Sequence, residues 1–296
     1  MHSIGIAVIA ALMMSCPLRA SADTELLTSQ RADELRAADQ AFGTASAKLE
    51  GRAGLKAAFA KDVIMPVPGK SFANGREEVL SALKANSGID AAHIEWAPVR
   101  VGISADASQG FSFGFMDQHQ ADGTSLGFKY LAYWQHQGNA WKIVAWKRVK
   151  RAYGKIDRRA MPALLPGSFP AQATPPALEA AEQAFSDEAQ TLGLGPAFAK
   201  FGSAESMNLG GSGNAGFVFG AKAIAQLVSA GQADGGSTLN WSADRVIVAA
   251  SGDLGISIGR IRFNAPVADG SDRRPIPFFT IWRRAAADQP WRYVAE

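Results

Sequence analysis

The sequence contains two copies of one pattern, and this duplication restricts the fold more than any other feature. Residues 94–114 align with residues 239–259 at a constant offset of 145, without a gap. The matched pairs include tryptophans and glycines: Trp96 and Trp241, Gly110 and Gly255, Gly114 and Gly259. Chance does not easily align such residues in one order over this length. The sequence therefore predicts a tandem duplication and not one large domain.

The duplication divides the 296 residues into four segments. Residues 1–22 are expected to be a signal peptide, 23–151 a first domain and 177–296 a second domain. Residues 152–176 contain five prolines, which block regular strand pairing and stiffen a chain. This segment is predicted to be a linker along the surface.

The first residues are typical of a secretory signal. The apolar run Ile4–Met14 is shorter than the roughly 20 residues that a membrane-spanning helix needs, and the small residues Ala20-Ser21-Ala22 follow it. The sequence thus predicts a periplasmic or secreted protein without a transmembrane segment. Lipidation at Cys16 is a weaker alternative. Cleavage after Ala22 would remove Cys16, the single cysteine, and would exclude disulfides and thiol chemistry from the mature chain.

Each copy has the same expected order of helices and strands. In the first copy, Leu35, Ala38 and Phe42 follow helical spacing, and a second helix is expected near 76–85. Four extended segments come after it, at 94–103, 110–119, 126–136 and 141–149. Helices followed by a meander of long strands predict an α+β fold, with a curved antiparallel sheet packed against the helices.

Several short motifs carry a family resemblance. They are the run Gly75–Val79, the strand start Ser251–Ile256 and the closing aromatic pattern Tyr130, Trp134 and Trp141. With the helix-first order, they resemble the nuclear transport factor 2-like superfamily. They are most similar to its SnoaL-like and ketosteroid-isomerase-like secreted domains of unknown function.

The resemblance covers both copies and implies two cone-shaped domains, each with N-terminal helices on a curved antiparallel sheet. It also implies that inward-facing residues of each cone decide the activity. Such domains commonly pair through their sheets, so the tandem copy is expected to form an intramolecular pseudo-dimer. The fold itself hosts isomerases, hydrolases, dehydratase subunits, transport factors and ligand pockets, and it therefore does not specify a function.

One strand of the first copy supplies the main candidate site. Phe111, Phe113 and Phe115 share one face, and strand alternation places Asp117 and His119 on that face too. If the face lines the cone, the phenylalanines form a ligand-binding wall. The carboxylate and imidazole would then support proton transfer. Solvated strand-end residues are the competing interpretation of Asp117 and His119.

Three further residues are weaker candidates. Tyr130 is a catalytic candidate, because a tyrosine donates a hydrogen bond in the isomerases that the fold resembles; buried packing is its competing role. Arg260 and Arg262 are ligand-binding candidates for an anionic group, or they line an exposed face. No copy of Asp117 and His119 occurs in the second repeat, so a duplicated active site is not expected.

Metal ions, cofactors and nucleic acids are not expected as partners. No histidine has a second ligand at metal spacing. Gly211–Gly216 matches the dinucleotide pattern G-x-G-x-x-G formally, but Phe217–Gly220 separate it from the next helix, so a loop is expected. The net charge of +3 is too small for a dedicated nucleic-acid binder. Whether the basic junction Lys147–Arg159 contacts a partner is not decided by the sequence.

The sequence favours a noncatalytic pocket for a small apolar or amphipathic molecule, because aromatic side chains dominate the candidate pocket strands. One alternative is an isomerase- or hydrolase-type acid/base enzyme with its site in the first domain. It requires a buried Asp117 close to His119 or Tyr130. The other alternative is a ligand-free interaction scaffold, which requires both cones to be filled by their own side chains. The identity of a ligand or substrate and the oligomeric state stay undetermined.

Overall fold

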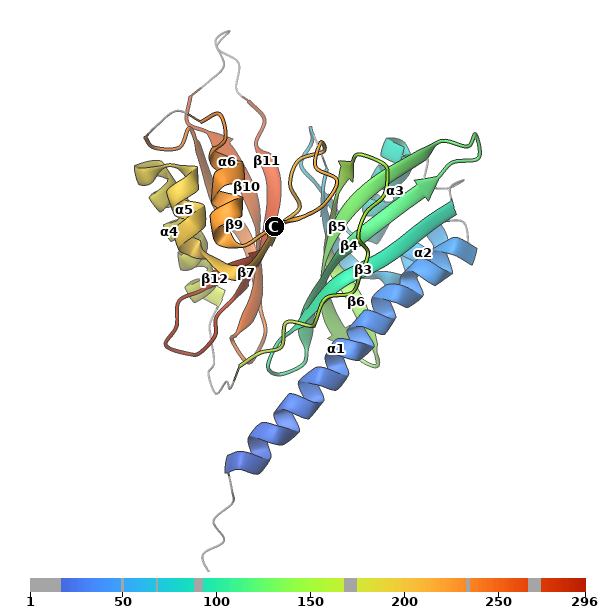
Figure 1. The fold of residues 1–296 in the computed structure, drawn as a ribbon, viewed down its shortest axis with the longest axis horizontal. Coiled ribbons are helices and arrows are strands. Elements are labelled where there is room, and N and C mark those ends of the chain that lie inside the picture. Colours follow the sequence, from blue (N-terminus) through green and yellow to red (C-terminus); the bar gives the residue numbers. More distant parts are fainter. Residues whose placement is uncertain are drawn as a thin grey trace, which may run out of the picture.

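The computed structural model describes residues 17–48, 51–67, 69–87, 93–167, 175–232, 235–265 and 273–296. These residues form two units, each with a six-stranded sheet and helices packed on one face. The predicted α+β class and the tandem arrangement are confirmed. Figure 1 shows the first unit in blue to green and the second in yellow to red, with the two sheets facing each other between outer helices.

The first unit contains three helices and six strands among its described residues. They are α1 (Pro17–Lys48), α2 (Gly51–Ala58), β1 (Phe59–Pro66), β2 (Phe72–Asn74), α3 (Arg76–Ser87), β3 (His93–Ile103), β4 (Gln109–His119), β5 (Ser125–Gln137) and β6 (Ala140–Arg151). The strand order is β2-β1-β6-β5-β4-β3. The four long strands pair antiparallel, whereas β1 pairs parallel with β6.

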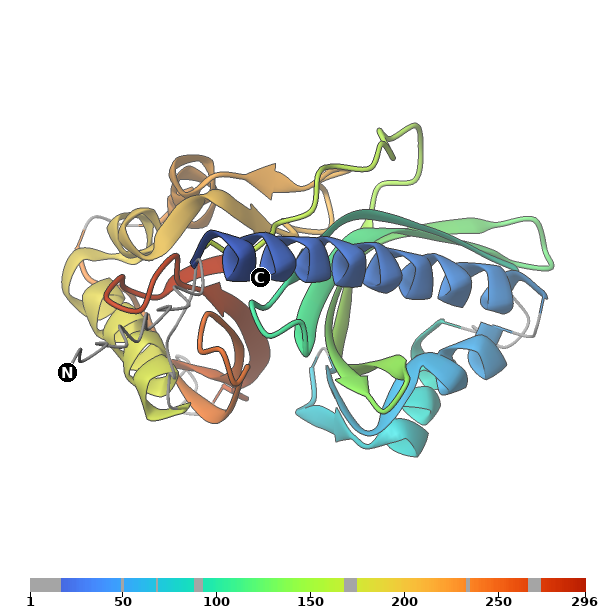
Figure 2. The same cartoon turned by 90° about the horizontal axis from the view of Figure 1, so that it is seen from below.

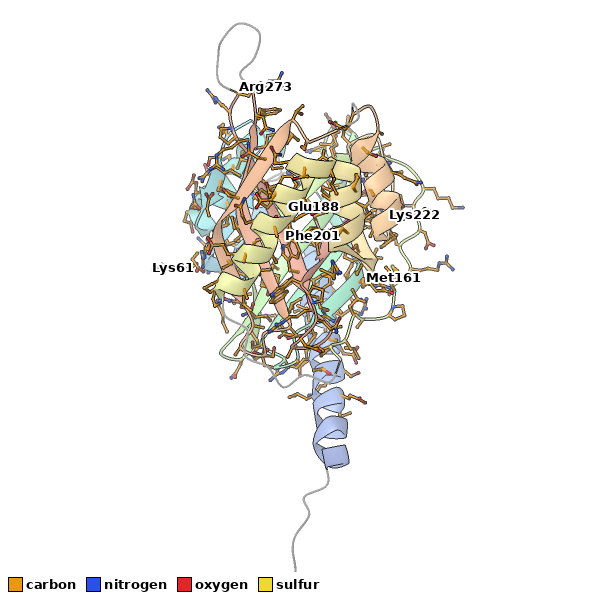
Figure 3. The ribbon with its side chains drawn as sticks, turned by 90° about the vertical axis from the view of Figure 1, so that its left-hand side faces the viewer. Lys61, Met161, Glu188, Phe201, Lys222 and Arg273 are labelled. Carbon is orange, nitrogen blue, oxygen red and sulfur yellow. The ribbon has the colours of Figure 1, made fainter. Side chains whose placement is uncertain are left out.

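The second unit repeats this order in its described part. Its elements are α4 (Pro175–Leu192), α5 (Leu194–Phe201), β7 (Gly202–Asn208), β8 (Val218–Phe219), α6 (Ala221–Ser229), β9 (Leu239–Val248), β10 (Leu254–Phe263), β11 (Ile276–Arg283) and β12 (Arg292–Ala295). The sheet order β8-β7-β12-β11-β10-β9 is the order of the first sheet, strand for strand. Figure 3 looks onto the helices of this unit, which cover the sheet face turned away from the first unit.

Helix α1 begins earlier than the first domain was expected to begin. It starts at Pro17, so the expected cleavage point after Ala22 lies within this helix. Figures 1 and 2 show α1 running along the first unit and projecting beyond it at its N-terminal end. The apolar run Ile4–Met14 and Cys16 lie outside the described residues. Among the helices of the described ranges, none has the length and apolar character needed to cross a membrane.

The proline-containing segment after β6 follows the edge of the first sheet. Met161 N donates to Val99 O at 2.7 Å, and Leu164 N donates to Val101 O at 2.9 Å. Ile103 N donates in turn to Leu164 O at 3.1 Å. These bonds use backbone groups of β3 that would otherwise be an open sheet edge. The described part of the segment therefore lies along the first unit as an irregular extra strand.

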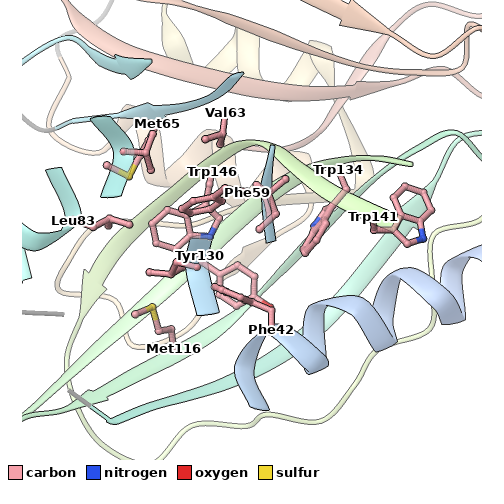
Figure 4. Packing of buried hydrophobic residues seen from close by; sticks show 14 of the residues in the cluster. Phe42, Phe59, Val63, Met65, Leu83, Met116, Tyr130, Trp134, Trp141 and Trp146 are labelled. Carbon is pink, nitrogen blue, oxygen red and sulfur yellow. The ribbon is translucent and has the colours of Figure 1, made fainter. Parts of the chain in front are cut away.

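Buried apolar residues form three clusters. One lies between the first sheet and its helices and contains Phe42, Tyr130, Trp134 and Trp146 (Figure 4). A second lies between the other sheet and α4–α6 and contains Phe185, Trp241 and Trp282. The third lies between the two sheets and takes residues from both units, among them Phe111, Phe113, Ile256, Ile258 and Phe279. Both faces of each sheet are therefore largely buried.

Two hairpins tie the units together reciprocally. Ala105 N, in the β3–β4 turn, donates to Asp253 Oδ1 at 3.0 Å. Ser251 N, in the β9–β10 turn, donates to Asp106 Oδ2 at 3.1 Å. Each turn thus supplies both a carboxylate acceptor and a backbone donor to the other, so the contact between the two units is reciprocal.

Candidate functional site

The three phenylalanines of β4 lie on the opposite face of the sheet from the one expected. Phe111, Phe113 and Phe115 belong to the cluster between the two sheets and do not face the helices of their own unit. Phe113 and Phe115 contact the ring of Phe217 from the second unit, with centroids 5.1 and 4.7 Å apart. The predicted sharing of one face is correct, but that face packs against the other unit. Phe115 also lines an inter-unit groove of about 570 Å³.

Asp117 shares this face and is held by two arginines. Its carboxylate accepts hydrogen bonds from Arg151, whose side chain is fully buried, and from Arg158 of the segment after β6. His119 Nδ1 instead contacts Ser125 Oγ at 2.9 Å, and its Nε2 lies 3.5 Å from Glu95. Asp117 is buried, but its oxygens are committed to ion pairs that fasten the segment after β6 to the sheet.

Tyr130 lies on the other face, inside the first cone. Its hydroxyl donates to Asp39 Oδ2 at 2.8 Å, and Trp96 Nε1 donates to Asp39 Oδ1 at 2.5 Å. Complete burial raises the pKa of Asp39 to about 6, although these donors and Ser112 act in the opposite direction. The sheet separates Tyr130 from Asp117. The structure therefore does not bring together the carboxylate and tyrosine on which the enzyme alternative depends.

The second unit contains an equivalent buried acid, Glu182 on α4. It accepts hydrogen bonds from Trp241 Nε1 at 2.7 Å, from Trp282 Nε1 at 2.9 Å and from Ser257 Oγ. Burial raises the pKa of Glu182 above its ordinary value, since desolvation outweighs the three donors. Trp282 Nε1 also lies 3.0 Å from Ser257 Oγ, as Trp134 Nε1 of the first unit lies 2.8 Å from Ser112 Oγ. The longer side chain of Glu182 adds a direct contact with this second tryptophan.

The space beside these acids is filled in the first unit and open in the second. Sheet register makes Phe278 the equivalent of Tyr130, because they pair with Gly259 and Gly114. Tyr130 stacks on Trp96 with ring centroids 3.8 Å apart.

The two units also differ in the residue that follows a matched alanine, on β6 in the first unit and after β12 in the second. Ala145 and Ala295 pair with Tyr133 and Ile281, so the residues that follow, Trp146 and Glu296, occupy equivalent positions. In the first unit the indole of Trp146 is fully buried in the cone, where Figure 4 shows it beside Phe59 and Tyr130. Glutamate is smaller than tryptophan, so the same position in the second unit leaves volume unfilled.

A cavity of about 270 Å³ occupies this position in the second unit. Its walls are mainly apolar, and its polar lining consists of few groups. The apolar lining residues are Phe185, Leu194, Phe198, Val228, Leu239, Trp241, Ile261, Phe278 and Phe279, and the polar ones are Lys147, Glu182, Asn208, Thr280 and Glu296. Largely apolar walls with a few convergent polar groups are the usual composition of a small-molecule site. This cavity is the candidate functional site.

One polar lining residue comes from the first unit. Lys147 of β6 points toward the second sheet, where its Nζ donates to Phe279 O at 2.9 Å and lies 4.5 Å from the centre of the Phe279 ring. Glu296 is held separately: its Oε1 accepts from Asn208 Nδ2 at 2.5 Å.

Burial perturbs both ionisable groups. It lowers the pKa of Lys147 to about 8 and raises the pKa of Glu296 to about 7. The mutual attraction of the two charges acts against both shifts. The cavity therefore has a polar end at which an ammonium and a carboxyl group, each with its own protein partner, are poorly solvated.

The two candidate arginines lie elsewhere. Arg260 forms an ion pair with Asp244 and lines a groove of about 340 Å³ that also includes Lys70 and Arg274. Arg262 donates to Ser242 Oγ at 2.9 Å. Neither arginine lines the cavity of the second unit.

The glycine-rich segment holds a lysine and has no dinucleotide-binding geometry. Lys129 Nζ donates to the carbonyl oxygens of Gly211, Asn214 and Gly216 at 2.8–3.3 Å. The short strand β8 separates the segment from α6, as the sequence indicated. Within the described ranges, no group of three or more histidine, cysteine, aspartate or glutamate side chains is arranged to hold a metal ion.

The acid and the lysine of the candidate site were not identified from the sequence, although the acid left a signal. The segment Asp39–Phe42 aligns with Glu182–Phe185, so an acid recurs at the same place on each first helix. An acid beside the apolar stripe of a helix is a recognisable exception to amphipathic patterning. Lys147 left no such signal, because it belongs to a run of basic residues near the end of β6.

No protein-family model matches the sequence, and the comparison with curated proteins found no match. Three solved structures match less than half of the chain over most of their own length. An NTF2-like protein of unknown function from Shewanella oneidensis is 13% identical, with a TM-score of 0.34, over 39% of this chain and 96% of its own. A ketosteroid isomerase-like protein from Erwinia carotovora is 14% identical, with a TM-score of 0.33, over 44% and 98%. An NTF2-like protein with a cystatin-like fold from Novosphingobium aromaticivorans is 15% identical, with a TM-score of 0.34, over 46% and 90%.

These matches name the same type of domain as the sequence resemblance did, and they carry no information on activity. The duplication itself is seen directly in the identical strand orders of the two sheets. The chain is a tandem pair of α+β domains, in which the space beside the buried acid is filled in the first unit and open in the second.

Proposed function

We propose that the protein binds a small, mainly apolar molecule in the cavity of the second unit. The observation that carries this proposal is the difference beside the two buried acids: Tyr130 and Trp146 fill the space in the first unit, whereas Phe278 and Glu296 leave about 270 Å³ open in the second. Protein interiors are normally close-packed, so an unfilled space of this size with convergent polar groups favours a ligand. The volume of the cavity suits a ligand of on the order of ten non-hydrogen atoms. A groove of about 710 Å³ also lies in the first unit, between α1, α2 and the adjoining ends of β5 and β6, but the buried acid Asp39 does not line it.

The contacts of Asp117 favour binding over the acid/base alternative in the first domain. Its carboxylate is occupied by Arg151 and Arg158, and Tyr130 faces away from it into a filled core. The scaffold alternative requires both cones to be filled, which the cavity in the second unit does not favour.

Export and internal pairing complete the proposal. The leader at residues 1–22 favours a periplasmic or secreted protein, on sequence grounds alone. The reciprocal contacts of Asp106 and Asp253 support an intramolecular pseudo-dimer, in which the second copy takes the place of a partner chain.

Native mass spectrometry of the protein purified from the cells that make it tests the binding function. The expected result is a bound small molecule, present in the wild type and lost in Ile261→Phe, which fills the cavity. Ile276→Phe is the matched control, because Ile276 is 45% exposed and does not line the cavity. Wild-type protein without any retained or exchangeable ligand would contradict the proposal. The same spectrum gives the mass of the mature chain and so tests cleavage after Ala22.

A further inference from the structure

The polar end of the cavity contains unused hydrogen-bonding capacity of both kinds. A lysine ammonium has three N–H donors, and the described contact of Lys147 with Phe279 O uses one of them. A carboxylate offers about four acceptor positions, and the described side-chain contact of Glu296 with Asn208 uses one. Glu182 differs, since three side-chain donors already occupy it. A ligand therefore meets one donor group, Lys147, and one acceptor group, Glu296, each with capacity left to bind it.

The position of Lys147 depends on how the two units are packed. On β6, Ala145 and Val149 lie on the face toward the second unit, and alternation places Lys147 on that face as well. Its ammonium is fixed by the carbonyl and the ring of Phe279 on β11. The lysine thus enters a cavity whose other walls all belong to the second unit.

We propose that this pocket is a composite of both domains and selects apolar molecules that carry a single hydroxyl group, which accepts a hydrogen bond from Lys147 and donates one to Glu296. The inference rests on the proposed function and adds the chemical class of the ligand. A hydroxyl group combines one donor with acceptor lone pairs in one small neutral group. It therefore satisfies both residues without bringing a net charge into the pocket.

Other polar groups fit this end of the cavity less well. A carboxylate would be attracted to Lys147, but it would take the counter-charge of Glu296 and place a second negative charge beside Glu296 and near Glu182, where like charges in a poorly solvated site repel strongly. An ammonium group would meet the same repulsion from Lys147. A pure hydrocarbon would displace water from Lys147 and Glu296 and replace none of its hydrogen bonds. The shifted pKa values of Lys147 and Glu296 agree with such a desolvated environment.

Isothermal titration calorimetry with one skeleton and four end groups tests the inference. The probes are tetralin, 2-tetralol, 2-aminotetralin and tetralin-2-carboxylic acid, whose bicyclic body suits the volume of the cavity. We expect 2-tetralol to bind at least about tenfold more tightly than each of the others, the gain expected from hydrogen bonds to charged groups. Equal or tighter binding of tetralin, the acid or the amine would overturn the inference.

Substitutions assign the selectivity to the two residues. Lys147→Met removes the ammonium group and keeps an unbranched side chain that is one atom shorter. It should weaken the binding of 2-tetralol about tenfold, while tetralin binds at least as tightly as before. Glu296→Gln should reduce the same preference, since it removes the charge and keeps the volume. Lys150→Met is the control, because Lys150 is exposed on the same strand and outside the cavity. Unchanged preference in Lys147→Met would refute the role of Lys147.

The two proposals fail in different ways. If all four probes bind with similar affinity and Ile261→Phe abolishes binding, the cavity is a binding site but does not select a hydroxyl group. If no probe binds and the purified protein retains no ligand, the binding function itself is wrong.

Discussion

At the scale of single residues, the two copies have kept a buried acid and changed what surrounds it. Asp39 and Glu182 are both completely buried and both accept an indole N–H, from Trp96 and Trp241. A buried carboxyl group is costly without such partners, so its environment must supply several donors. In the first unit Tyr130 is one of them. In the second unit the longer side chain of Glu182 reaches a second indole, that of Trp282, which supplies a donor in place of the tyrosine hydroxyl.

The residue-scale prediction concerns Asp117, which the structure assigns to an ion-pair cluster. Replacing it in Asp117→Ala leaves the guanidinium of Arg151 buried without its carboxylate. We expect the free energy of unfolding to fall by about 3–5 kcal/mol, as measured by urea denaturation. Asp122→Ala, at an exposed hairpin tip, is the matched control and should change it by less than about 1 kcal/mol. Unchanged stability in Asp117→Ala would show that the ion pairs contribute nothing.

At the scale of elements, each first long strand has an irregular position opposite a glycine. The register of β3 shifts between Pro98 and Arg100, opposite Gly114 of β4. The register of β9 shifts at the corresponding place, opposite Gly259 of β10. A Cβ atom at Gly114 would overlap the carbonyl oxygen of Ala97, and one at Gly259 would overlap that of Ser242. The glycine pair of the alignment thus permits close backbone approach at a bulge.

The element-scale prediction follows from this overlap. Gly114→Ala and Gly259→Ala should each lower the free energy of unfolding by on the order of 3 kcal/mol, because backbone atoms cannot move aside as a flexible side chain can. Gly213→Ala is the control, since a Cβ atom there meets nothing within 4 Å. Thermal denaturation of the three variants checks the prediction. If Gly114→Ala and Gly259→Ala melted at the same temperature as the control, the strands would accommodate the added Cβ atom without losing stability, and the prediction would be wrong.

At the scale of the whole molecule, the sheets cover each other. The shared cluster buries Phe111 and Phe113 against residues such as Ile256 and Ile258. Polar contacts support it: Arg283 Nη2 of the second unit donates to Ile103 O at 2.6 Å, and Arg100 pairs with Glu205 at 2.7 Å. The apolar sheet faces that a separate domain would offer to a partner chain are used within the molecule.

The prediction at this scale is that the protein is a monomer in solution. Analytical ultracentrifugation at micromolar concentration should give the mass of one chain, because the sheet surfaces are already paired. Ile256→Glu places a charge in the shared layer and should destabilise the fold and promote association, whereas Ile276→Glu, at a 45% exposed position, should do neither. A stable wild-type homodimer would contradict the prediction.

Repetition and periodicity were sufficient for much of the architecture. The offset of 145 between Trp96 and Trp241 identified two copies, and the helix-then-strand order predicted the α+β class that the sheets confirm. Alternation along β4 also showed correctly that Phe111, Phe113 and Phe115 share a face. These features depend on neighbours along the chain, and local spacing is what a sequence records directly.

Tertiary structure alone decided which face of each sheet packs on its own helices, which face packs on the other unit, and where the cavity lies. Alternation distinguishes an inner from an outer face only when one of them is exposed to water, and here both faces of each sheet are buried. The expectation that Phe111, Phe113 and Phe115 line the cone of the first unit was therefore wrong. The open cone depends on Glu296 standing where the first unit has Trp146, and on the Lys147 side chain reaching the second unit. Those contacts join Lys147 to Phe279, 132 residues apart in the chain. No local pattern encodes such a distance, because it arises only when the two sheets pack together.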